Sequence, residues 1–128
     1  MPIAYWCVLA AAILPILLTG IAKVGGPGFN NARPRDFVAR DIAAFRKRAY
    51  WAHLNGLEAF APFAAGVVIA GLRGADPAWL DGLALTFIAA RVVYSGFYIA
   101  DWASARTFAW MVALGCVVGL FVIAALAG

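Results

Sequence analysis

The chain has 128 residues, of which 66% are hydrophobic and 12% are charged. Soluble domains contain about 45–50% apolar residues, and so few charges could not cover this much apolar surface in water. The composition therefore excludes a soluble domain and predicts a single all-α integral membrane domain over residues 1–128. Seven of the ten Lys and Arg lie between residues 23 and 48. A basic cluster beside membrane helices is typical of a topology signal, so we expect no nucleic-acid partner.

Four apolar segments are long enough to cross a membrane, because a bilayer core of ~30 Å requires ~20 helical residues. They run over about residues 2–22, 46–72, 78–100 and 104–127. The first contains Pro15, where we expect a kink. Residues 23–48 contain Gly, Pro and Asn and predict a long polar loop. The other connections are short, so the sequence predicts a four-transmembrane-helix antiparallel bundle.

The positions of the positive charges predict an orientation. Because excess Lys and Arg mark the cytoplasmic side, we expect the 23–48 loop to be cytoplasmic and both termini to lie outside. The connection between the third and fourth spans then lies on the same side as the 23–48 loop. The start of the second span, the end of the third and the start of the fourth therefore meet at one membrane face.

Polar residues form stripes on two spans, because residues three, four and seven apart share one face of a helix. In the second span this spacing aligns Arg48, Trp51, Asn55, Glu58 and Pro62, and in the third span Arg91, Tyr94 and Tyr98. Arg106 opens the fourth span at the expected depth of Tyr98. His53 falls on the opposite side of the second span, and we expect it to be an interhelical or interfacial residue rather than a base.

Two interpretations of these stripes remain open. A charge at the centre of a bilayer costs at least ~2.5–3.5 kcal/mol, so Glu58 is expected to pair with Arg91 or Arg48, while Asn55 bridges helices. Alternatively, the arginines, Asn55 and the tyrosines converge on an anionic ligand that accepts hydrogen bonds.

Three motifs resemble those of the MAPEG family (membrane-associated proteins in eicosanoid and glutathione metabolism). The first is "RAYWAHLNGLEAFAPF" at residues 48–63, which has the family's order of Arg, Asn, Glu and Pro. The second is "RVVYSGFY" at residues 91–98, and the third is Arg106 at the start of the fourth span. Together with the four spans and the basic first loop, they cover nearly the whole chain in the family's order.

The resemblance implies a bacterial-type member in the inner (cell) membrane that forms a homotrimer among membrane lipids. It implies a glutathione site between protomers, with a lipophilic small molecule as second substrate. The residues implied to bind glutathione, the co-substrate, are Arg48, Asn55, Glu58, Arg91, Tyr94 and Tyr98. Arg106 matches the catalytic arginine that activates the thiol. The implied function is a glutathione-dependent transferase or peroxidase that acts on lipophilic electrophiles or hydroperoxides.

Two positions depart from the family pattern. Trp51 stands where glutathione-using members often have a second arginine, and Trp110 stands where an aromatic residue is often Tyr. The first departure leaves open whether glutathione or another thiol is used. It also favours an alternative: a non-catalytic membrane protein of the same fold that binds lipid or docks a partner. A transporter or channel is disfavoured, because the polar residues do not line a continuous path.

Some residues are expected to be structural only. Cys7 and Cys116 lie in apolar runs and are expected to be small buried residues. Asp101, in the turn before the fourth span, is expected to be a cap or a solvated charge. "GCVVG" at residues 115–119 is a small-xxx-small pattern that predicts helix packing.

Overall fold

The computed structural model describes residues 1–128 and consists of helices and their connections. The elements are α1 (Ile3–Lys23), α2 (Pro34–Ala39), α3 (Ala44–Leu72), α4 (Pro77–Ile99) and α5 (Ala103–Leu126). All except α2 are long and apolar enough to cross a membrane. The predicted four-helix class is confirmed, and each predicted span agrees with a helix to within two residues at either end.

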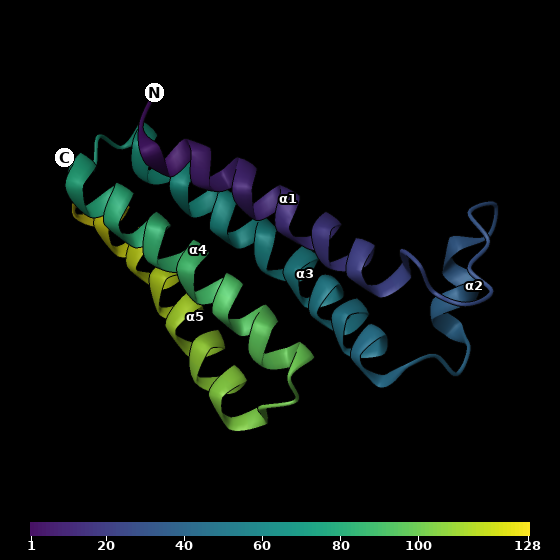
Figure 1. Ribbon diagram of the computed structural model, residues 1–128. Helices are drawn as coiled ribbons and strands as arrows, with labels where there is room; N and C mark the ends of the chain where they lie inside the picture. Colours follow the sequence, from purple (N-terminus) through teal and green to yellow (C-terminus); the bar gives the residue numbers. More distant parts are fainter.

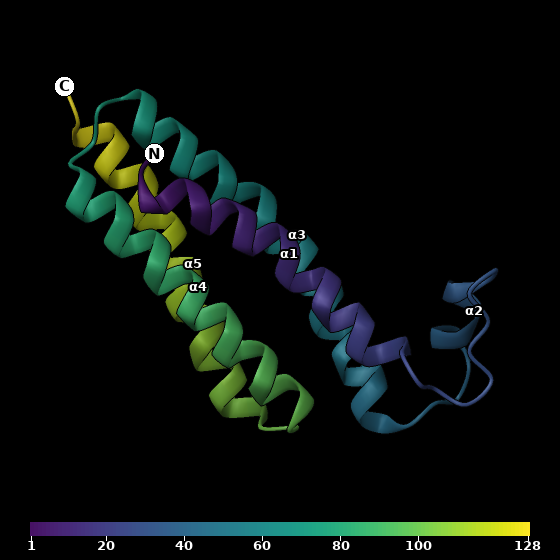
Figure 2. The same cartoon turned by 45° about the horizontal axis from the view of Figure 1, so that its top comes forward.

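The long helices form a bundle in which α1 packs chiefly against α3 and α4 chiefly against α5. Additional contacts of α3 with both α4 and α5, and of α1 with α4, join the two pairs. Both termini lie at one end of the bundle, and the α4–α5 turn lies at the other end together with the start of α3 (Figures 1 and 2). The relative arrangement of the connections therefore agrees with the topology predicted from the sequence.

Small residues allow the helices to approach closely. Ala52 and Ala70 of α3 and Ala84 of α4 have no exposed surface. A Cβ added to Gly71 of α3 would lie 2.2 Å from Oη of Tyr5 in α1. The rings that fill the remaining space, such as Phe63 and Phe87, stack with their centroids 3.9 Å apart. The interior is thus closely packed, with alanine and glycine where helices approach and larger apolar side chains in the space between them.

The predictions for the structural residues can now be compared with the packing. Cys7 and Cys116 are buried and free, as expected. Of the two glycines in the predicted packing motif, Gly119 faces Leu83 of α4, with 3.1 Å between an added Cβ and Leu83 Cδ2. Gly115 has no neighbouring atom within 4 Å of an added Cβ, so only one of the two makes a contact within the chain.

Residues 23–48, which we call the basic segment, are not simply a polar loop. They contain α2, whose first residue is Pro34 and whose first turn holds Asp36; both residue types favour a helix start. Phe37 of α2 is 1% exposed and meets Phe29 edge to face, with 5.5 Å between ring centroids. Six residues are too few to show a helical period, which is why the sequence pattern did not predict α2.

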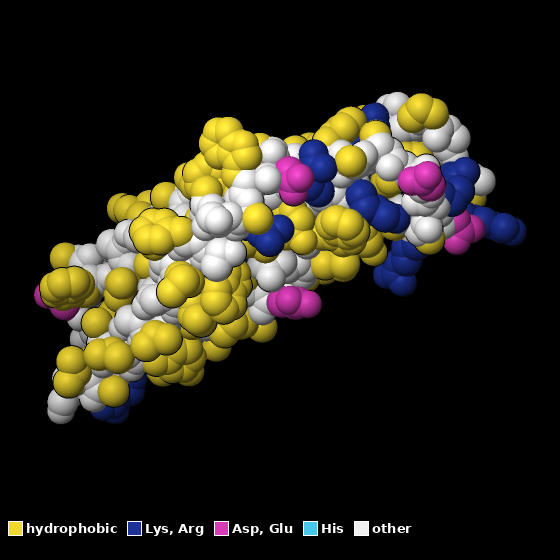
Figure 3. Space-filling model, turned by 90° about the horizontal axis from the view of Figure 1, so that it is seen from below, with side chains coloured by type: hydrophobic (Ala, Val, Ile, Leu, Met, Phe, Trp, Pro, Cys, Tyr) yellow, Lys and Arg dark blue, Asp and Glu magenta, His cyan; other side chains and the backbone are white.

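The surface along the length of the bundle is mostly hydrophobic, as expected for contact with lipid. Figure 3 shows yellow side chains over the bundle, whereas most of the Lys and Arg gather toward the end that carries α2.

Candidate functional site

Hydrogen bonds and a ring contact hold the turn between α4 and α5 in one conformation, which sets the position of the first turn of α5. Asp101 has a positive φ of 64°, and the Trp102 N–H donates to Phe97 O at 2.9 Å. The Asp101 N–H donates to Tyr98 O at 3.1 Å, which completes a Schellman cap. The rings of Phe97 and Trp102 stack across the cap with centroids 5.6 Å apart. This cap places Arg106, in the first turn of α5, beside the last turn of α4.

Two arginines and two tyrosines form a row of contacts from this turn into the bundle, with the two tyrosines side by side between the arginines. Arg106 Cζ lies 4.4 Å from the centroid of the Tyr98 ring, and Arg91 Cζ lies 4.2 Å from that of Tyr94. The two tyrosine rings meet edge to face at 5.7 Å. The expectation that Arg106 lies at the depth of Tyr98 is confirmed.

Arg48 joins the start of α3 to the same region. Its Nε donates a hydrogen bond of 2.8 Å to the carbonyl oxygen of Ile99, the last residue of α4. The expectation that Arg48 lies at this end of the bundle is confirmed. In the single chain, its contact is with the backbone of α4, and it supports the α4–α5 turn.

A groove of about 250 Å³ lies between α3 and α5, with α4 as its floor. The lining residues are Asn55, Glu58, Ala59, Pro62, Phe87, Arg91, Trp110, Ala113, Leu114 and Val117. The floor is formed by Phe87 and Arg91, which are 2% and 3% exposed. Glu58 and Trp110, from the two walls, lie on the exposed rim. The groove is therefore apolar over most of its length and polar where Asn55, Glu58 and Arg91 meet.

Two residues that line this groove have a buried polar atom without a hydrogen-bond partner: Oδ1 of Asn55 and Nη2 of Arg91. Nη2 of Arg91 lies on the side toward α1, 3.9 Å from a Cβ added to Gly56. Buried polar groups in proteins are nearly always hydrogen-bonded. The guanidinium of Arg91 donates no hydrogen bond within the chain, so the two residues offer a free donor group and a free acceptor to a ligand with both kinds of group.

The predicted ion pair of Glu58 is not formed within one chain. Glu58 is exposed, Nη2 of Arg91 has no partner, and Arg48 donates to Ile99 O. The prediction assumed that a charge in a span must lie inside its own bundle. Glu58 instead lies on the rim of the groove, facing away from the interior. Asn55, expected to bridge helices, makes no such bridge through Oδ1.

The predicted site residues thus form two adjoining groups. Asn55, Glu58 and Arg91 line the groove, whereas Arg106 and Tyr98 lie at the α4–α5 end; Arg91 and Tyr94 connect the two groups. Phe87, on the groove floor, was not predicted. It lies four residues before Arg91 on the stripe that continues to Tyr94 and Tyr98, and this spacing could have identified it.

His53 lies outside the site, as expected. Its Nδ1 is 2.7 Å from the carbonyl oxygen of Pro15 in α1, and its ring stacks on that of Tyr50 with 5.8 Å between centroids. Because a carbonyl only accepts, Nδ1 carries the proton. His53 therefore joins α1 to α3 and has a structural role.

The fold and the groove define an integral membrane protein with four spans and a polar site between its second and fourth spans. The sequence profile of the MAPEG family matches residues 3–126, nearly the whole chain. The chain therefore belongs to the MAPEG family, a family of membrane proteins of glutathione and eicosanoid metabolism. No curated protein and no solved structure matches it significantly.

Proposed function

We propose that this protein is a glutathione-dependent transferase or peroxidase that acts on lipophilic electrophiles or hydroperoxides. We propose further that it lies in a bacterial inner membrane with the basic segment on the cytoplasmic side. The observation that carries the proposal is the guanidinium of Arg91, which is buried on the floor of an apolar groove and has an Nη2 without a partner.

The chemistry of glutathione suits the two unpartnered atoms. A peptide carboxylate would accept from the guanidinium of Arg91, and an amide or ammonium N–H would donate to Oδ1 of Asn55. Arg48, Tyr94 and Tyr98 would complete the donors for the rest of the peptide. Glu58, on the rim, would accept from the ammonium group. The apolar part of the groove, toward Leu114 and Val117, would hold the lipophilic second substrate.

The size and position of the groove favour a site between protomers of a homotrimer. Its volume of about 250 Å³ is below the ~300–1,000 Å³ typical of ligand pockets. Its rim residues Glu58, Trp110 and Leu114 are exposed in the single chain. A neighbouring chain packed against α3 and α5 would deepen the groove and remove the exposed carboxylate of Glu58 from lipid.

Arg106 is the proposed catalytic residue. A free thiol of this kind has a pKa of ~8.5, so only a few per cent is thiolate at neutral pH. The guanidinium of Arg106, together with the positive end of the α5 dipole, would stabilise the thiolate. The thiolate would attack an aryl halide carbon, forming a C–S bond and releasing halide. With a hydroperoxide, two glutathione molecules would be oxidised to the disulfide while the substrate is reduced to an alcohol and water.

A second candidate is a non-catalytic protein of the same fold that binds lipid or docks a partner. It is favoured by Trp51, which lies on the stripe of Arg48 and Asn55 and is 46% exposed. An indole cannot bind a carboxylate as an arginine does. The loss of this cation would weaken the binding of glutathione.

The two candidates are separated by measuring glutathione conjugation to a small aryl halide by the purified protein in mild detergent. The enzyme proposal predicts turnover that saturates with both substrates and is lost in Arg106→Ala. Binding of lipid without conjugation at any glutathione concentration would establish the non-catalytic alternative. Arg35→Gln, on the exposed surface of α2, is the matched control and should keep full activity.

A further inference from the structure

The cations of the basic segment are not neutralised by carboxylates. Arg40 Nη2 donates to Gly28 O at 2.8 Å, and Arg46 Nη1 donates to Val24 O at 2.9 Å. Lys47 Nζ donates to the carbonyl oxygens of Arg40 and Val38. These hydrogen bonds fold the segment around its own backbone. A carbonyl is neutral, so each cation keeps its full charge.

Two further arginines are directed to the outside. Arg33, which precedes α2, and Arg35, in its first turn, are exposed and make no side-chain hydrogen bond within the chain. On the opposite side of the short helix, Phe37 is buried and fixes its orientation. The segment as a whole carries seven cations and two carboxylates, Asp36 and Asp41, and has a net charge of +5.

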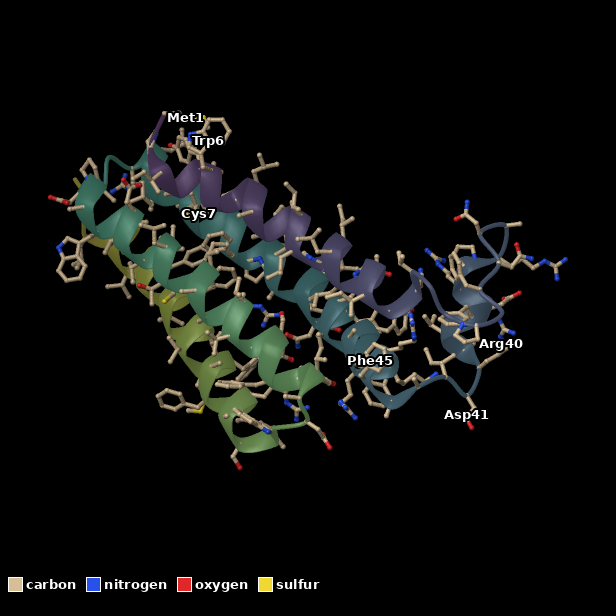
Figure 4. All side chains as sticks on the ribbon, in the orientation of Figure 1. Met1, Trp6, Cys7, Arg40, Asp41 and Phe45 are labelled. Atoms are coloured by element: carbon tan, nitrogen blue, oxygen red, sulfur yellow. The ribbon has the colours of Figure 1, made fainter.

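The segment lies at one end of the bundle and to one side of it. In Figures 1 and 2, α2 stands beyond the last turn of α1 and away from α4 and α5. Figure 4 places Arg40 and Asp41 at the end of the molecule opposite Met1. Phe45, at the start of α3, is 43% exposed and has Arg46 Cζ 5.1 Å from its ring centroid. A long cationic side chain such as that of Arg46, near the end of a span, extends toward the headgroup level.

We propose that the basic segment is a docking surface for the anionic headgroups of membrane phospholipids. Both ends of the segment join helices long and apolar enough to cross a membrane, so the segment is tethered next to the lipid headgroups. Guanidinium groups bind phosphate through paired N–H donors. The carbonyl contacts of Arg40, Arg46 and Lys47 keep the segment folded before a headgroup binds, which lowers the entropic cost of binding.

The experiment uses the full-length protein in nanodiscs of phosphatidylcholine with increasing fractions of phosphatidylglycerol. Asn31→Cys, in an exposed position beside α2, is labelled with a polarity-sensitive fluorophore. Cys7 and Cys116 are buried, so the label reports on the basic segment alone. We expect the emission to shift as the phosphatidylglycerol fraction rises, and high salt to reverse the shift.

Charge variants test which residues bind. Arg33→Gln and Arg35→Gln should each weaken the apparent affinity for phosphatidylglycerol by roughly fivefold. Each variant should therefore require a higher phosphatidylglycerol fraction for half of the shift. Asp41→Asn removes an exposed negative charge and should lower that fraction. The three variants should have the parent's emission in pure phosphatidylcholine, which verifies that the segment remains folded.

The proposal is overturned by an emission that is the same in both lipids, or by Arg33→Gln and Arg35→Gln variants that respond as the parent does. It is also overturned if soluble glycerol phosphate produces the same shift in phosphatidylcholine nanodiscs, since the surface would then bind free anions. A shift that appears only when an acidic protein is added would assign the surface to a protein partner instead.

Discussion

The guanidinium of Arg106 in α5 lies over the ring of Tyr98 in α4, with 4.4 Å between Cζ and the ring centroid. Arg91 makes the same kind of contact with Tyr94, at 4.2 Å. The face of an aromatic ring is negative and attracts a cation. This attraction does not use the N–H groups that point outward in the plane of the guanidinium. Both guanidiniums are therefore positioned while donors remain available for an anionic ligand.

We predict that Arg106→Ala lowers the rate of conjugation at neutral pH by roughly 10–100-fold. The reason is that lowering the thiol pKa by two units stabilises the thiolate by ~2.7 kcal/mol. Without the guanidinium, the pKa of the bound thiol rises toward its free value. The pH optimum should then move upward, and the rate at high pH should approach that of the parent. A pH–rate profile measures both effects.

Arg106→Lys is the control for this prediction, because it keeps the charge but not the planar group that stacks on Tyr98. It should recover part of the rate and most of the pH profile. If Arg106→Ala reacts as fast as the parent at neutral pH, another residue activates the thiol.

A second prediction concerns Arg48 and the turn that it supports. Arg48→Gln removes the donor to Ile99 O and should lower the free energy of unfolding by about 1.5–3 kcal/mol, the usual contribution of a charged hydrogen bond. Amide hydrogen exchange at Trp102 should become faster, because the α4–α5 turn opens more often. Arg35→Gln removes the same charge from a side chain without partners and should leave the exchange unchanged. Equal exchange in Arg48→Gln and the parent would show that the bond does not hold the turn.

A third prediction follows from the backbone of Asp101, whose φ is 64°. Left-handed conformations cost a residue with a Cβ more than they cost glycine. Asp101→Gly should therefore raise the free energy of unfolding by up to ~1 kcal/mol, whereas Asp101→Val should lower it. Asp101→Asn, which tolerates this conformation, should be nearly neutral. Thermal unfolding in detergent distinguishes these results, and a loss of stability in Asp101→Gly would mean that the carboxylate matters.

Most of the fold was predictable because hydrophobicity in a membrane protein is a strong signal. Runs of apolar residues the length of a bilayer fix the number of helices, and short turns fix their antiparallel order. The helix α2 was not predictable, because its stability comes from contacts of Phe37 with Phe29 and Gly26 that no local pattern reveals.

The candidate site was predictable in composition but not in its contacts. Helical spacing placed Asn55 and Glu58 on one stripe and Arg91 and Tyr98 on another. It does not specify how each helix is rotated within the bundle. The sequence therefore could not show that Arg91 is buried on the groove floor while Glu58 lies on its rim. The pairing predicted between them followed from charge alone and is wrong for the single chain.

A fourth prediction concerns the packing of α1 against α3. In Gly71→Ala the new Cβ would collide with Tyr5 Oη, so the Tyr5 ring or one of the two helices must shift, which should lower the free energy of unfolding by about 1–3 kcal/mol. Gly82→Ala in α4 meets no atom within 4 Å and should be neutral or stabilising, since alanine is the better helix former. Thermal unfolding should show a lower Tm for Gly71→Ala and an equal or higher Tm for Gly82→Ala than for the parent. Equal stabilities would mean that the contact of Tyr5 with α3 is loose.

The central claim, that the groove floored by Arg91 binds glutathione, is tested most directly by isothermal titration calorimetry of the purified protein in mild detergent. We predict saturable binding of glutathione by the parent and roughly tenfold weaker binding by Asn55→Ala, the loss expected for one hydrogen bond. Arg35→Gln, outside the groove, should bind as the parent does. A parent protein that shows no saturable binding, or an Asn55→Ala variant that binds with unchanged affinity, would contradict the claim.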